Sequence, residues 1–273
     1  MADILLSAAT RSSLFALSSV QSQMTTLQTR LATGKRVNQP TDNPINFFLA
    51  AELNGRAGQI DALTSGITDA QGSITAANNG IASIRSLLTT AQSVANQALQ
   101  SSDPTVRAGF ATQFDGLLQQ VDAIAADSGF NGVNLLTGSS TTVNLNETGT
   151  SNITITGSSA TSSGLGVAAS TNQFQLNSDI NTAMSNVSNA LNSLQGISAS
   201  LGATSSVMQS RLDFNKSMIN TLQSGADSLT LSDTNEDSAS LLALQTRQQI
   251  AAMTLSLARD RDTSVLRLFD TSR

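Results

Sequence analysis

The sequence predicts a mainly α-helical fold, an elongated antiparallel helical bundle or coiled coil with a small β-hairpin insert and paired N- and C-terminal helices. Apolar residues recur at alternating steps of three and four over long stretches of the 273 residues, as in coiled coils. A short central segment instead alternates apolar with polar residues, which is typical of strands. The order of segments is nearly symmetric, so we expect the two ends to pair.

The first predicted helix ends at Gly34, since glycine commonly follows a helix. A second, longer apolar series runs from residue 60 to residue 98, and at about 1.5 Å per residue it would be roughly 60 Å long. Asp103 and Pro104 close this helix and open the next. The face of that third helix consists of Phe110, Phe114, Leu117, Val121 and Ile124.

The middle of the chain differs from its ends. Residues 129–176 are rich in Gly, Ser and Thr and hold almost no charge. We expect residues 137–172 to face solvent, either as an unmodified polar loop or as a site of O-linked glycans, and disorder of residues 157–172 stays open. The alternating residues that predict the hairpin are Val143, Leu145, Ile153 and Ile155.

Helical periodicity returns at Ala183 and runs to Leu222, and a break is expected at Ser224-Gly225. Residues 232–237 are typical of a helix N-cap, with acidic side chains at the positive end of the dipole. The last helix carries two neighbouring apolar seams, so we expect it to have more than one neighbour. Residues of the second seam are Leu242, Gln249, Met253 and Leu257.

The composition excludes most catalytic chemistry. The chain has no His and no Cys, so it lacks an imidazole base, a thiol nucleophile and the common kinds of zinc site. We expect no catalytic, cofactor or metal site. The net charge of −5 is opposite in sign to that of a typical nucleic-acid binder. No apolar run approaches the about 20 residues of a membrane span, and the N-terminus does not resemble a secretory signal.

The terminal helices are predicted to mediate self-association. They carry wide apolar stripes and little charge, and such a pair of helices would be marginal alone. Exposed apolar helices usually mark an interface. The residues expected to make the contacts are Leu14, Leu17, Val20, Met24, Leu27, Leu31, Leu244, Ala251, Leu255, Ala258, Val265, Leu266, Leu268 and Phe269.

Four motifs, in order along the chain, resemble those of bacterial flagellins. They are LATGKRVN at 31–38 with TDNP at 41–44, NGIASIR at 79–85, GFNGVNLL at 129–136, and a C-terminal set of QQIA at 248–251, LSLA at 255–258 and SVLRLF at 264–269. The resemblance covers roughly residues 1–136 and 178–273. The chain resembles a short, minimal flagellin, like those of α-proteobacteria, that lacks large outer domains.

This resemblance implies a structural subunit that polymerises into the bacterial flagellar filament used for motility. It implies an inner coiled-coil domain in the filament core, formed by residues 1–44 and 227–273. An outer helical rod domain, residues 45–226, would carry the β and loop insert at about 129–176. Secretion by type III export to the extracellular flagellum would follow. The implied partners are the chain itself, a filament cap, hook-associated proteins and an export chaperone, with no nucleic acid and no membrane.

The chain departs from the family pattern on the rod surface that faces an animal innate receptor. Flagellins sensed by that receptor commonly show Arg-Glu-Leu-Ala where this chain has RSLL at 85–88, and an acidic residue where it has Gln120. We expect Arg85, Leu88 and Gln120 to mark this surface and receptor activation to be weak or absent.

Two alternatives to a filament subunit remain open. A hook–filament junction protein would share the terminal helices and the export route without building the long polymer. A coiled-coil surface adhesin, binding a receptor through residues 137–172, would need an anchor that the sequence does not show. An enzyme is the least favoured class, because no residues supply a site.

Overall fold

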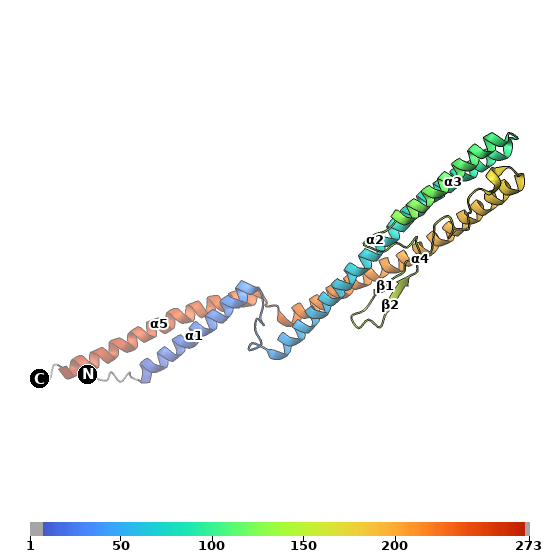
Figure 1. Cartoon of the computed structure of the whole chain (residues 1–273). Helices are drawn as coiled ribbons and strands as arrows, with labels where there is room; N and C mark the ends of the chain where they lie inside the picture. The colour runs from blue at the N-terminus through green and yellow to red at the C-terminus, as the bar shows by residue number, and fades with distance from the viewer. Residues whose placement is uncertain (1–7, 271–273) are drawn as a thin grey trace. The chain divides into compact units, whose positions relative to one another are not determined.

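The computed structural model describes residues 8–270, which form five long helices, one two-stranded antiparallel sheet and a short helical turn (Figure 1). The mainly α fold with a small β-hairpin insert is therefore confirmed. The chain divides into two compact units, a smaller one up to residue 55 and from residue 221 on, and a larger one over residues 56–220. The elements are α1 Ala8–Thr33, α2 Pro44–Gln100, α3 Pro104–Asp127, β1 Thr141–Asn144, β2 Asn152–Ile155, η1 Thr171–Phe174, α4 Asn177–Thr230 and α5 Thr234–Asp270.

In the larger unit, α2 and α4 run antiparallel. Asn215 Nδ2 donates to Thr64 Oγ1 at 3.5 Å, and Gln92 Nε2 donates to Ser188 Oγ at 3.1 Å. The predicted heptad seam of α2 lies in the core, where all its members from residue 67 to residue 98 are at most 5% exposed. Phe114 and Val121 of α3 are fully buried in the same core. The spacing of apolar residues thus predicted which face of each helix is covered.

Both predicted helix starts are confirmed by their caps. Asp103 Oδ1 accepts hydrogen bonds from two backbone N–H groups of α3, at 2.7 and 3.4 Å. Asp233 Oδ1 does the same at the start of α5, at 2.9 and 3.3 Å. These bonds satisfy N–H groups that have no partner within the helix. The acidic cluster at residues 233–237 therefore has a structural role as a cap.

The predicted break at Ser224-Gly225 is wrong, because α4 continues to Thr230. A glycine inside a helix costs only about 1 kcal/mol relative to alanine. The helix ends where backbone N–H groups from outside α4 donate hydrogen bonds to the carbonyl oxygen of its last residue. The carbonyl oxygen of Thr230 accepts from the backbone N–H groups of Arg36 at 2.7 Å and Val37 at 3.2 Å.

The GFNGVNLL motif forms a helix stop followed by a tight turn. The backbones of Phe130 and Val133 exchange two hydrogen bonds, at 2.8 and 2.9 Å. The two central residues have positive φ, +47° for Asn131 and +78° for Gly132. A two-residue turn of type I′ requires positive φ at both of these positions. Asn134 Nδ2 then donates to two carbonyl groups in the last turn of α3, at 2.8 Å each.

The expectation that residues 137–172 face solvent holds for most residues of the segment, but it is wrong for six buried apolar side chains. Two aspartates of α3 hold the loop by its serines. Asp122 accepts from the N–H and the hydroxyl of Ser162 at 2.6 and 2.9 Å, and Asp115 accepts from Ser170 in the same way at 2.7 and 2.8 Å. Because the aspartates are seven residues apart, they lie on one face of the helix. The apolar residues of the segment at most 9% exposed are Val143, Leu145, Ile155, Ala160, Leu165 and Val167.

The buried Arg107 connects the chain before α3 to the chain before α4. It is 9% exposed and donates to the carbonyl oxygens of Ser101 at 2.6 Å and Gln175 at 2.8 Å, and to Asn177 Oδ1 at 2.6 Å. Hydrogen bonds to a charged group are stronger than neutral ones. The bonds of Arg107 hold together the end of the larger unit where η1 is followed by α4.

We predict opposite effects for two glycines of α2. A Cβ at Gly80, in the NGIASIR motif, would lie 2.7 Å from Leu136 Cδ1, whereas a Cβ at Gly66 meets nothing within 4 Å. Gly80→Ala should lower the free energy of unfolding by about 1–3 kcal/mol through overpacking. Gly66→Ala should raise it by up to about 1 kcal/mol through helix propensity. Urea denaturation followed by far-UV circular dichroism measures both, and equal shifts would contradict the close packing at Gly80.

Candidate self-assembly surface

The helices α1 and α5 lie side by side in the smaller unit (Figure 1). Gln248 Nε2 donates to Gln21 Oε1 at 2.9 Å across the pair. The predicted pairing of the N- and C-terminal helices is confirmed. Met24 and Leu244, each 7% exposed, are the most buried of the residues that were expected to make the self-association contacts. Those of them that α1 and α5 turn toward each other form the seam of the pair. The half-buried members of the seam are Leu17, Val20, Leu27, Leu31, Ala251, Leu255 and Ala258.

A second apolar face of α5 is exposed. Residues two positions from the seam are turned by about 200° around the helix axis, so they point away from α1. Among the described residues none covers them. The exposed face consists of Leu242 at 66%, Ile250 at 57%, Met253 at 71% and Leu257 at 58% exposure.

The helix α1 also leaves apolar side chains open. Phe15 is 79% exposed, and Leu14, which was expected in the seam, is 41% exposed. The remaining predicted contact residues lie outside the residues whose side chains the structure describes; they are Val265, Leu266, Leu268 and Phe269. Fully burying a side chain such as Leu, Met or Phe stabilises by about 1.5–3 kcal/mol. The exposed side chains of α1 and α5 together could therefore drive association with another apolar surface.

The LATGKRVN motif fixes the turn that follows α1. Gly34, with φ +68°, ends the helix, and its carbonyl oxygen accepts from the N–H of Ser232 at 3.0 Å. Asp42 Oδ2 accepts from two backbone N–H groups of the same turn, at 2.9 and 3.0 Å. Asn43 Oδ1 accepts from the N–H of Asn46 at 3.0 Å and so caps the start of α2. The motif thus holds α1 at the point where α4 passes into α5.

The predicted receptor-facing residues do not share one surface. Arg85 and Gln120 are exposed, but Leu88 is 0% exposed. The placement of Leu88 on the surface is wrong, because it is a member of the heptad seam of α2 and packs in the core.

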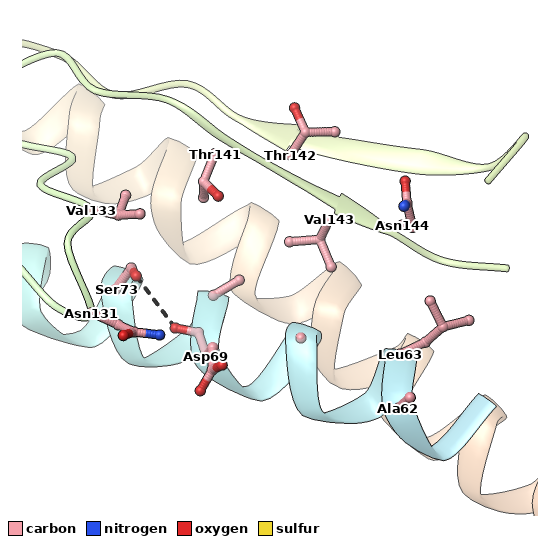
Figure 2. Close-up of a pocket in the computed structure, with 12 residues that line it drawn as sticks. Ala62, Leu63, Asp69, Ser73, Asn131, Val133, Thr141, Thr142, Val143 and Asn144 are labelled. Carbon is pink, nitrogen blue, oxygen red and sulfur yellow. Dashed lines mark hydrogen bonds between the residues drawn. The ribbon is translucent and has the colours of Figure 1, made fainter. Parts of the chain in front are cut away.

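The larger unit has a hollow of about 320 Å³ between α2 and β1 (Figure 2). Ser73 Oγ donates to the carbonyl oxygen of Asp69 at 3.3 Å on its wall. Asp69 is the one titratable residue among those that line the hollow, so it offers no pair of groups for acid–base chemistry. Nowhere in the described chain do three potential metal-ligating His, Cys, Asp or Glu residues come together. No helix of the described chain is both long and apolar enough to cross a membrane.

The N-terminal half of the chain determines its family. Residues 5–141 match the family model described as the bacterial flagellin N-terminal helical region. The chain belongs to the bacterial flagellin family. Flagellins are structural proteins, and this flagellin is accordingly a structural subunit of the bacterial flagellar filament.

Similarity to known flagellins extends over nearly the whole chain. Flagellin FljM of Caulobacter vibrioides is 29% identical over 258 residues, which cover 93% of each chain. A flagellin of Brucella melitensis is 25% identical over 98% of this chain and 99% of its own. The crystal structure of Bacillus cereus flagellin matches 55% of this chain and 88% of its own, with a TM-score of 0.49 and 16% identity. None of these findings favours a hook–filament junction protein or an adhesin.

Two leucines of α5 give a matched prediction for the helix pair. Leu244→Ala removes a side chain that is 7% exposed and should destabilise the pairing of α1 with α5 by about 2–4 kcal/mol. Leu242→Ala removes one that is 66% exposed and should change it by less than about 0.5 kcal/mol. Short-pulse amide hydrogen exchange of monomeric protein would measure protection in both helices. Equal loss of protection in the two variants would contradict the assignment of the seam.

Proposed function

We propose that this flagellin polymerises through the exposed apolar face of its terminal helices. The observation that carries the proposal is the 58–71% exposure of Leu242, Met253 and Leu257 on the side of α5 turned away from α1. Apolar patches of this kind mark interaction sites on soluble proteins. In a polymer of identical subunits, burying these side chains against a neighbouring copy would supply the free energy of assembly.

We further propose that residues 1–44 and 227–273 form the inner domain at the filament core and residues 45–226 the outer rod. The division of the chain into two compact units, with boundaries at residues 55/56 and 220/221, supports this assignment. The partly buried loop of residues 157–172 would belong to the rod. A purely structural, non-enzymatic role fits a sequence without His or Cys.

We propose a secretion route and partners on the basis of the resemblance to flagellins. The chain would leave the cell by type III export and reside in the extracellular flagellum. Its partners would be copies of itself, a filament cap, hook-associated proteins and an export chaperone. The support for these partners is the resemblance of the terminal motifs to flagellins.

The apolar face can be tested by assembly of purified protein on short filament seeds. The triple variant Leu242→Ser, Met253→Ser and Leu257→Ser should raise the critical concentration for polymerisation at least about a hundredfold, because it removes three apolar contacts. A control with Val106→Ser and Leu176→Ser, exposed apolar residues of the larger unit, should assemble far better. Sedimentation of filaments measures both. Normal assembly of the triple variant, with an unchanged monomer by circular dichroism, would refute the proposal.

We also propose that the innate receptor of animals responds weakly to this flagellin. Arg85 is exposed, Gln120 carries no charge, and Leu88 is buried, so the surface offers few of the contacts that the family pattern provides. A receptor reporter assay with monomeric protein should show a response far below that of a flagellin carrying the full pattern. An equal response at equal concentration would contradict this expectation.

A further inference from the structure

One guanidinium group of the smaller unit lacks an acceptor. Arg30 lies in the last turn of α1 and is half-buried. Its Nε is shielded from solvent and has no hydrogen-bond partner in the described part of the chain. No carboxylate of the described residues lies within 4.0 Å of Arg30. The ion pair that the structure does contain joins Arg56 to Glu147 in the larger unit. A buried donor left without an acceptor costs about 1–3 kcal/mol, and more when it is charged.

Open space lies on two sides of Arg30. A hollow of about 530 Å³ lies along the helix pair and is lined by residues of α1 and α5, among them Arg30 and Arg247. A second hollow, of about 360 Å³, separates α1 from the turn of residues 36–42, and Arg30 and Arg36 are among its lining residues. Ser22 and Thr26 of α1 line both hollows. Arg30 thus lines open space on two sides, although its Nε is covered.

The second hollow has an excess of positive charge, because Arg30 and Arg36 line it with a single acidic residue. In the second hollow the one carboxylate is Asp42, and its Oδ2 already accepts two backbone N–H groups. In the first hollow Asp237 already accepts the hydroxyl of Ser232, and Glu236 lies beyond ion-pair distance of both arginines. Guanidinium groups bind carboxylates in a planar, two-bonded geometry. The hollows therefore suit a further carboxylate.

We propose that Arg30 binds a carboxylate of a second copy of the chain in the filament. This inference rests on the proposed function, in which copies meet at the smaller unit. The chain has a net charge of −5, so a neighbouring copy brings an excess of acidic side chains. Exposed carboxylates of the smaller unit whose side-chain oxygens accept none of the hydrogen bonds or ion pairs given by the structure include Glu52 and Asp227.

Seeded assembly of two Arg30 variants tests the inference. Arg30→Gln should raise the critical concentration at least about tenfold, since it removes the charge and the fork of donors. Arg30→Lys, which keeps the charge but has no Nε, should have a smaller effect of about threefold. The matched control Arg85→Gln removes the same charge from an exposed arginine of the larger unit and should change it by less than about twofold. The melting temperature of monomeric Arg30→Lys should match that of the wild type.

Inorganic phosphate distinguishes the second copy from a free anion. If phosphate raises the melting temperature of the wild-type monomer but not of Arg30→Gln, and both variants assemble like the wild type, Arg30 binds small anions and the inference is overturned. Normal assembly of both variants without a phosphate effect overturns it as well. If Arg30→Gln destabilises the monomer, Arg30→Lys decides, because unimpaired assembly of that variant contradicts the inference. In each case the triple serine variant of α5 tests the proposed function separately.

Discussion

Two paired helices bury only the faces that they turn toward each other. This constraint determines which apolar side chains of each unit are buried and which stay exposed. In the larger unit, α3 and the loop that leads to η1 add further layers to α2 and α4. Side chains such as Ile67, Ile84 and Leu194 are therefore completely enclosed. The described part of the smaller unit has no third helix over α1 and α5. Most of its seam residues stay half-buried, and the outer face of α5 keeps its apolar side chains in water. The same heptad chemistry thus produces one unit with an enclosed core and one whose described helices leave an apolar face exposed.

The polar residues of the larger unit complete that third layer. Asp115 and Asp122 tie an otherwise featureless Ser- and Thr-rich segment to α3, so its few apolar side chains can reach the core. Arg107 satisfies carbonyl groups at the end of the unit, and Phe174 stacks edge-on against Phe114 with ring centroids 5.3 Å apart. The segment that ends at Phe174 has positive φ at three consecutive non-glycine residues. Such a backbone is costly, and the buried ring and the bonds of Arg107 hold it in place.

Periodicity and capping residues were enough to predict the helices, their buried faces and the hairpin. Each of these features depends on residues that are close together in the sequence, such as the helix caps Asp103 and Asp233. The errors arose where distant residues decide. The sequence around Gly225 predicts a helix end, but α4 continues to Thr230. There the backbone N–H groups of Arg36 and Val37 donate to the carbonyl oxygen of Thr230. Residues 157–172 were expected to face solvent, because the sequence of the segment does not show that Asp115 and Asp122 of α3 bind its serines. The two seams of α5 were recognised, but the sequence could not show which of them α1 covers. The unsatisfied Nε of Arg30 has no sequence signal, because it depends on three-dimensional packing around one side chain.

We propose that polymerisation buries the outer face of α5. Hydrogen–deuterium exchange with mass spectrometry, comparing monomers with seeded filaments at the same pH, tests it directly. Peptides spanning residues 242–257 should gain strong additional protection once the subunits are in the filament. Filaments whose peptides from this region exchange as fast as those of the monomer would contradict the claim and place the contacts between subunits elsewhere on the chain.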